Sequence, residues 1–413
     1  MVDTTCPVNG QSRHGDSAGI DLCGKGLEGS GVPVLLLSPY APRPVDPGRN
    51  SLRRLPVGIF SSSSPLSRRS MLGLMALPLL AAKPPHPAKG TADTTVVLVT
   101  DYATPQLAAN AAVNKRLRFP AGRTYTVSDL LIPAGCYVEG NGAILRTPDS
   151  STTDSSDDGI LVVGGNNVTI DGLEFDGNIQ NQDGTWNQHR HQVRVHGNYS
   201  NVLVKDCTFS NIIGDGVYIN VGSGGNTGHT IEVRDCTFTA ANNNRNGVSV
   251  TSGTNVHVHH NTFTNMARPD MPGAIDIERN SVTDVIADIL IEYNTITRAA
   301  LSGTGSRYGI LAAMFNCVGT NIVFRNNNVS GAGLSAACLI IGDNSGTLNA
   351  STVTVTGNTF HDAGGAGVEL NYGIRPDITD NQFTNLSPGI LNYNSFLGNT
   401  SGNTFTNVVP QIS

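Results

Sequence analysis

Two acidic residues placed two positions apart, Asp276 and Glu278, are the most reactive pairing in the sequence. They lie in the segment PGAIDIERN, where they alternate with Ile275 and Ile277. In a β-strand this alternation buries the two isoleucines and turns both carboxylates to the other face, with their Cα atoms about 6.5–7 Å apart. A third acid, Asp215 in GDGVYIN, belongs to an earlier strand of the same kind, roughly 10 Å away if such strands stack.

Carboxyl groups at these separations are typical of acid–base chemistry on a glycosidic bond. In an inverting glycosidase, carboxyls about 6.5–9.5 Å apart protonate the leaving oxygen and activate water. Nearby like charges also raise the pKa of one acid, which keeps it protonated. The first hypothesis therefore makes Asp276, Glu278 and Asp215 catalytic, with both strand acids exposed to solvent. The competing interpretation is that the acids are simply solvated or bind Ca²⁺. No other cofactor or metal is expected.

A second cluster favours a different reaction, elimination or epimerisation of a uronate. Such a reaction needs a base at C5 and a cation or amide that neutralises the sugar carboxylate. His191 or Tyr218 could be the base, and Arg194 or Arg245 the neutralising group. An ordinary exposed strand face is the plain alternative. The residues expected to bind substrate are Arg194, His191, His196, Tyr218, Asn220, Arg245, Arg268 and Tyr308.

Three further histidines, His257, His259 and His260, fall in the segment NVHVHHNTF. The sequence supplies them with no evident acid partner, so we interpret them as structural, and a zinc site is not expected.

Stacked strands are the elements that would position these residues. A segment of the form NVLVKDCTF recurs along the chain, with the ends of successive copies 22 to 34 residues apart, which indicates a repeat with loops of variable length. The last residues of the copies are Phe175, Phe209, Phe238, Phe263, Ile296, Val329, Phe360, Phe383 and Phe405.

A second strand of each repeat carries the chemistry. Its outward positions are predicted to form a polar strip about 15 Å long, which suits a few sugar units. The strip consists of Arg194/His196, Tyr218/Asn220, Ser249/Thr251 and Asp276/Glu278. Beyond it the same face becomes apolar, at Leu311, Ala313 and Ile340.

One column of the repeat predicts a ladder of stacked side chains, in which each asparagine amide hydrogen-bonds to the next. Two cysteines precede the asparagines and are expected to be interior thiols, because stacked side chains point in parallel and do not favour a disulfide. The column runs Cys207, Cys236, Asn261, Asn294, Asn327, Asn358, Asn381 and Asn403.

The 413 residues divide into three predicted parts. Residues 1–66 are rich in Gly, Pro and Ser and are expected to be a disordered leader or upstream extension. Residues 67–90 begin with SRRSMLGLMALPLLAA, which is typical of a twin-arginine export signal, and its apolar run is too short for a membrane span. Residues 91–413 are expected to form one domain, with a short capping helix within Thr104–Phe119 that carries the apolar residues Leu107, Ala111 and Ala112.

These repeats resemble the right-handed parallel β-helix of the pectate lyase superfamily, and the opening FPAGRTYTVSDLLIPAGCYVEGNGAIL resembles the start of pectate-lyase-like and polygalacturonase-related chains. The resemblance implies an all-β solenoid and a carbohydrate-active enzyme among lyases, glycoside hydrolases, epimerases and tailspike depolymerases. Polygalacturonase-like members also gather three acids in a groove. A non-catalytic glycan-binding β-helix is the third hypothesis.

The expected partner is therefore a polysaccharide or oligosaccharide, met in the periplasm or outside the cell. The formal charge of −6 gives no reason to expect nucleic acid or an anionic membrane. The apolar strip at Leu311 and Ile340 should be covered by a loop or by another subunit, and related enzymes suggest a homo-oligomer such as a trimer.

Overall fold

The computed structural model describes most of the chain from Thr94 to the C-terminus. The described residues are 94–151, 158–182, 189–221, 229–239, 245–266, 273–279, 281, 283–297, 308–314, 319–331, 337–342, 351–371, 374–393, 395 and 397–413. The predicted leader (1–66), the predicted export signal (67–90) and Arg268 lie outside these residues.

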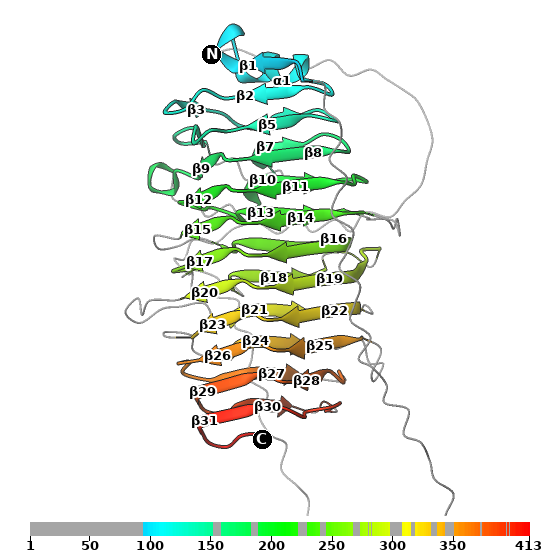
Figure 1. Ribbon diagram of the computed structural model, residues 1–413. Coiled ribbons are helices and arrows are strands. Elements are labelled where there is room, and N and C mark those ends of the chain that lie inside the picture. The colour runs from blue at the N-terminus through cyan, green and yellow to red at the C-terminus, as the bar shows by residue number, and fades with distance from the viewer. Residues whose placement is uncertain are drawn as a thin grey trace, which may run out of the picture. The chain divides into compact units, whose positions relative to one another are not determined.

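The described residues wind into stacked coils, and each complete coil contributes one strand to each of three parallel sheets (Figure 1). The first sheet contains β1 (Val96–Leu98), β2 (Arg116–Arg118), β5 (Tyr137–Glu139), β8 (Val168–Asp171), β11 (Val202–Lys205), β14 (Ile231–Arg234), the second half of β16 (Val248–His259), β19 (Ile286–Glu292), β22 (Thr320–Arg325), β25 (Val353–Thr356) and β28 (Asp377–Thr379).

The second sheet consists of short strands that follow the first sheet along the chain. It contains β3 (Thr124–Thr126), β6 (Ile144–Arg146), β9 (Glu174–Asp176), β12 (Thr208–Ser210), β15 (Thr237–Thr239), β17 (Thr262–Thr264), β20 (Thr295–Thr297), β23 (Asn328–Ser330), β26 (Thr359–His361), β29 (Gln382–Leu386) and β31 (Thr404–Val408).

The third sheet carries the predicted polar strip, and the long strand β16 runs from it into the first sheet. Its other strands are β4 (Leu130–Ile132), β7 (Asp158–Val163), β10 (Arg190–His196), β13 (Val217–Asn220), β18 (Ile275–Glu278), β21 (Tyr308–Ala313), β24 (Ala337–Gly342), β27 (Ala366–Asn371) and β30 (Ile390–Tyr393). The parallel all-β architecture predicted from the repeats is confirmed.

The described helical segments are η1 (Val99–Asp101), η2 (Ile179–Asn181) and α1 (Pro105–Ala111). Helix α1 begins after the N-cap Thr104, whose hydroxyl accepts a hydrogen bond from the Leu107 amide, and it is much shorter than the predicted helical segment. Its buried side chains are Ala108 and Ala109, whereas the apolar Leu107 is 50% exposed. No helix among the described residues is long and apolar enough to span a membrane.

Columns of identical side chains form the interior between the sheets. The rings of Phe175, Phe209 and Phe238 stack in succession with centroids 4.9 Å and 4.5 Å apart, because successive coils repeat the same position. The predicted asparagine ladder is also confirmed: Nδ2 of Asn261 donates to Oδ1 of Asn294, and Asn294 donates in the same way to Asn327. Next to this ladder the two column cysteines, Cys207 and Cys236, are buried free thiols, as predicted.

Candidate active site

The predicted polar strip lies on the third sheet in the predicted register. Arg194 pairs with Tyr218, Tyr218 with Ser249, and Ser249 with Asp276 across β10, β13, β16 and β18. A register shift after Ile219 then pairs Asn220 with Ser252 instead of Thr251. The strand register therefore aligns the outward polar side chains in a row, because the aliphatic residues that alternate with them are buried and fix the register.

Asp215 lies at the centre of the strip, in the turn before β13, and its side chain is fully buried. Nη1 of Arg245 donates to both carboxylate oxygens, at 3.2 Å and 2.9 Å, and Nδ1 of His191 lies 3.2 Å from Oδ2. Burial alone would raise the pKa of Asp215, but the Arg245 charge and the His191 contact outweigh it and lower this pKa below its ordinary value. Asp215 is therefore held ionised.

His191 is buried, and its two ring nitrogens have different surroundings. Nδ1 lies 3.2 Å from the backbone nitrogen of Asp215 and 3.2 Å from its carboxylate, contacts that require opposite tautomers. An amide N–H can only donate, so the contact with the Asp215 amide requires an unprotonated Nδ1 that accepts. If Nδ1 carries the proton, it instead donates a hydrogen bond to the Asp215 carboxylate. In either tautomer Nε2 is buried and has no hydrogen-bond partner among the described residues.

Asp276 is held in the opposite electrostatic state. It is only 2% exposed, so the prediction of a solvated side chain was wrong: a side chain that points away from the core can still be covered by its neighbours. Burial raises the pKa of Asp276 well above its usual value, the adjacent Glu278 raises it further, and Arg245 only partly offsets this. Within the described part of the chain, Oδ1 of Asp276 has no hydrogen-bond partner.

Asn246 joins the two aspartates. Its backbone nitrogen donates to Oδ1 of Asp215 at 3.4 Å, and its Nδ2 donates to Oδ2 of Asp276 at 3.1 Å and to Oγ of Ser249 at 3.0 Å. We did not identify Asn246 from the sequence. The repeat does contain the signal, because RNGV places Asn246 at the position that Asp215 takes in GDGV.

Glu278 is the acid of the strip nearest to solvent, since it is only partly buried. Burial raises the pKa of Glu278, and the Arg245 charge opposes the shift without cancelling it. Arg245 thus faces three carboxyls, Asp215, Asp276 and Glu278, which raise its own pKa against the effect of burial. The structure brings together the three acids that the first hypothesis made catalytic.

Tyr218 connects the acids to a patch of hydroxyl and amide groups. Its ring stacks on His191 with centroids 4.2 Å apart and an interplanar angle of 4°. Its hydroxyl accepts hydrogen bonds from Nδ2 of Asn220 at 3.3 Å and from Oγ1 of Thr251 at 3.2 Å. His191, Tyr218 and Arg245, which the second hypothesis used, therefore border the same centre as the acids.

The remaining predicted substrate-binding residues lie toward the edges of this arrangement. Arg194 is partly buried on β10, and His196 at the end of that strand is exposed. Tyr308 is partly buried at the start of β21, one coil beyond Asp276 in the pairing order.

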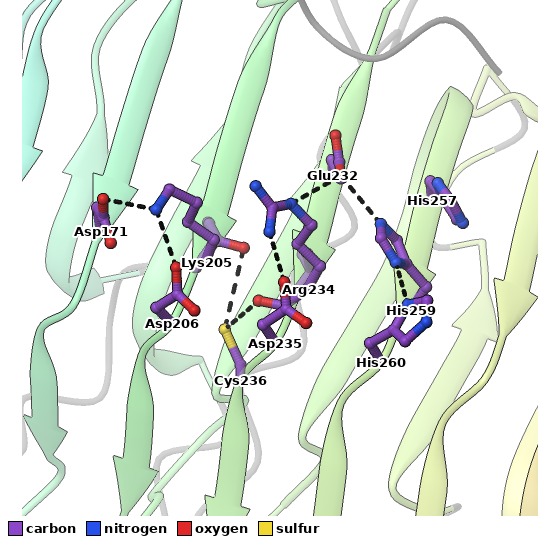
Figure 2. A network of polar contacts seen from close by, with 12 residues as sticks. Asp171, Lys205, Asp206, Glu232, Arg234, Asp235, Cys236, His257, His259 and His260 are labelled. Atoms are coloured by element: carbon purple, nitrogen blue, oxygen red, sulfur yellow. Dashed lines mark hydrogen bonds and ion pairs between the residues drawn. The ribbon is translucent and has the colours of Figure 1, made fainter.

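Two of the three histidines that we interpreted as unsupported, His257 and His259, lie on the first sheet and have acid partners. Figure 2 shows the contact between His259 and Glu232. Nε2 of His257 lies 2.8 Å from Oε1 of Glu292, and Nε2 of His259 lies 2.9 Å from Oε1 of Glu232. The sequence contained no sign of these acid partners because they come from neighbouring coils: Glu292 lies 35 residues from His257, and Glu232 lies 27 residues from His259. Despite burial, hydrogen bonds from His257 and Arg325 lower the pKa of Glu292 to about 2. His259 likewise lowers the pKa of Glu232.

The family model "Right handed beta helix region" matches residues 132–281 and 273–411. Together these matches span more than half of the chain, and the chain belongs to this family of right-handed parallel β-helices. No curated protein sequence matches the chain.

Solved structures share the fold at low sequence identity. PfbA, a surface adhesin of Streptococcus pneumoniae, is 14% identical with a TM-score of 0.55, over 77% of this chain and 93% of its own. The A-module of the Azotobacter vinelandii mannuronan C-5 epimerase AlgE6 is 15% identical with a TM-score of 0.51, over 78% and 95%. An exopolygalacturonase from Thermotoga maritima is 12% identical with a TM-score of 0.50, over 78% and 92%.

Proposed function

We propose that this protein is an exported carbohydrate-active enzyme that hydrolyses glycosidic bonds of a polysaccharide or oligosaccharide. An adhesin, an epimerase and a polygalacturonase have similar folds, so the fold does not choose among these activities. One observation supports hydrolysis: Asn246 contacts both Asp215 and Asp276, whose pKa values are shifted in opposite directions. Carboxyls whose environments separate their pKa values are typical of an acid and a base that act in one reaction.

The roles follow from these protonation states. The raised pKa of Asp276 favours its protonated form, and Asp276 is assigned as the general acid that donates to the leaving oxygen. Asp215 is held ionised and supplies the base through the His191 ring, whose Nδ1 lies 3.2 Å from it. Glu278 helps to keep Asp276 protonated and, as the most accessible acid, is placed to contact the sugar.

The hydroxyl and amide groups beside the acids suit a sugar that binds along the strip. Tyr218, Asn220 and Thr251 present donors and acceptors, and Arg194 and His196 extend the strip along β10. Tyr308, one coil beyond Asp276, is proposed to contact the other end of a bound glycan. Arg268 stays a predicted substrate-binding residue. The proposed chemistry requires no cofactor. Helix α1 is proposed to cover the first coil.

A second candidate function, a lyase or C5-epimerase acting on a uronate polymer, is favoured by the unpartnered Nε2 of His191. In that reaction His191 or Tyr218 would abstract the C5 proton, and Arg245 would neutralise the uronate carboxylate. Arg245 already faces three carboxyls, which leaves it less available for a fourth and favours the hydrolase.

The deciding experiment is a panel of polysaccharides, neutral and uronate, tested with and without a chelator. Hydrolysis produces new reducing ends without a new ultraviolet chromophore, whereas β-elimination produces an unsaturated uronate that absorbs. Epimerisation changes the uronate composition without breaking the chain. Binding to a glycan with no product of any kind would support the non-catalytic interpretation and overturn the proposal.

A further inference from the structure

A compact group of side chains on the first sheet is not used by the proposed reaction. Glu232 on β14 pairs in register with His257 on β16, and His259 follows two residues later on the same face. Only 3%, 7% and 8% of these three side chains is exposed. Strand pairing on both sides fixes their backbone, so the three side chains are held together before any ligand binds.

The donor atoms of these residues converge. Glu232, His257 and His259 each offer one atom, and all three atoms lie within 4.8 Å of one another. The two imidazole rings stack with centroids 3.8 Å apart, and Nε2 of His259 lies 2.9 Å from Oε1 of Glu232. In tetrahedral zinc sites with bonds of about 2.0–2.2 Å, ligand atoms are about 3.4 Å apart. Small side-chain rotations would therefore bring the three atoms to that spacing.

A partner for the remote nitrogen of His259 is already present. Nδ1 of His259 lies 2.7 Å from Nδ1 of His260, which itself stacks on Tyr293 with centroids 5.0 Å apart (Figure 2 shows the His259–His260 contact). A metal-bound histidine donates its other ring N–H to a neighbouring acceptor, which fixes the tautomer and orients the ring. His260 is placed to accept that hydrogen bond.

One cation competes for the carboxylate. Nε of Arg234 lies 3.0 Å from Oε1 of Glu232, and the Arg234 guanidinium also pairs with Asp235. A metal ion would displace Arg234 from Glu232 while Asp235 retained it. Arg234 therefore weakens metal binding without preventing it. A variant that lacks the Arg234 charge should bind the metal more tightly.

We propose that Glu232, His257 and His259 form a binding site for one zinc ion, with water in the fourth position. Two imidazoles and one carboxylate suit Zn²⁺ and related transition metals, whereas Ca²⁺ prefers sites built from oxygen alone. The site lies on a different sheet from the candidate active site and is independent of the proposed function.

Zinc titration of the chelator-treated full chain tests the proposal directly. Calorimetry should detect one equivalent of Zn²⁺, and Co²⁺ in its place should give the visible spectrum of a four-coordinate site. Glu232→Gln and His259→Gln should each weaken binding by about a hundredfold or more, since ligands matter at least as much as their outer partners. His361→Gln is the matched control, because His361 also pairs with an acid, Asp362, outside the site.

Two further variants separate lost ligands from lost folding. His260→Asn should weaken zinc binding by about 10–100-fold, and the backbone accepts it, because Asn326 takes the same turn position with the same φ of 54°. Arg234→Gln should strengthen binding, which general destabilisation cannot do. No stoichiometric zinc binding by the full chain, or affinities unchanged in these variants, would overturn the proposal.

Discussion

At the residue scale, Asp215 and Asp276 show how one side-chain type acquires two states from its neighbours. Both are buried, and Asp215 is paired directly with the Arg245 guanidinium. Asp276 receives a hydrogen bond from neutral Asn246 and faces the like charge of Glu278. Opposite charges favour ionisation and like charges oppose it, so burial leads to opposite outcomes at the two positions.

The catalytic assignment predicts the kinetics of amide variants. Asp276→Asn removes the proposed general acid and should lower turnover by at least about a hundredfold, the usual scale of such catalysis. Glu278→Gln should also lower it. Glu369→Gln is the matched control, because Glu369 takes the equivalent outward position on β27, three coils beyond Asp276. Steady-state rates on a substrate found in the panel measure these effects.

Two results would contradict the hydrolase assignment. Near wild-type rates for both Asp276→Asn and Glu278→Gln would show that these carboxyls do not take part in the reaction. Loss of activity in His191→Gln or Tyr218→Phe, with the amide variants active, would transfer the reaction to the lyase or epimerase assignment.

The raised pKa of Asp276 also predicts how folding stability depends on pH. Because the folded state binds this proton more tightly than the unfolded state, the stabilisation is complete below the unfolded pKa of about 3.9. It is lost as pH rises through the folded pKa. Asn is neutral at every pH, so Asp276→Asn should gain stability relative to the natural protein as pH rises. Denaturant unfolding at several pH values measures the difference.

Asp215→Asn supplies the contrast to that variant. The folded pKa of Asp215 is lowered, so its contribution is present above the unfolded pKa and lost as pH falls through the folded pKa. Removing this charge leaves the partly buried Arg245 without its closest anion, and loss of one partner of a buried ion pair typically costs about 3–5 kcal/mol of stability, an upper value here near neutral pH. Equal unfolding curves for the two amide variants would show that the two aspartates do not differ as described.

At the element scale, the turn between the first and second sheets is repeated in almost every coil. A residue with positive φ, such as Tyr293 or Asn326, precedes the ladder position. The ladder asparagine that follows donates to a backbone carbonyl of the preceding coil and to the next asparagine, as Asn294 does to Val258 and Asn327. These bonds hold successive coils in register at the turn.

The ladder predicts the cost of interrupting it. Asn294→Ala removes the acceptor of the Asn261 amide groups and leaves buried polar atoms unpaired, each worth about 1–3 kcal/mol. Thermal and denaturant unfolding should therefore show a large loss of stability. The control is Asn110→Ala, because Asn110 is an exposed residue of α1. Similar stabilities for both variants would mean that the ladder contributes little.

At the scale of the whole molecule, the apolar end of the strip was predicted to be covered by a loop or by another subunit. Leu311 is partly buried and Ile340 only 5% exposed within one chain, so the chain itself covers much of this surface. A homo-oligomer such as a trimer stays a prediction, and the mass of the protein in solution tests it.

Export is the second prediction at this scale, and it rests on the paired arginines Arg68 and Arg69. If this segment directs twin-arginine export, replacing both with lysine should retain the protein inside the cell at normal expression. Fractionation with an antibody to the β-helix measures the distribution. Unchanged export of the double variant would remove the twin-arginine interpretation.

The sequence by itself determined the architecture, because each coil repeats one pattern of buried and outward positions. It predicted the strip from Arg194 to Glu278 and the asparagine ladder, since stacked strands convert a chain repeat into columns in space. Only the tertiary structure decided which groups are buried and which charges meet. It placed Asp276 out of solvent, bridged it to Asp215 through Asn246, and paired His257 and His259 with glutamates from other coils. Such contacts depend on side-chain reach between coils, which strand spacing in the sequence does not specify.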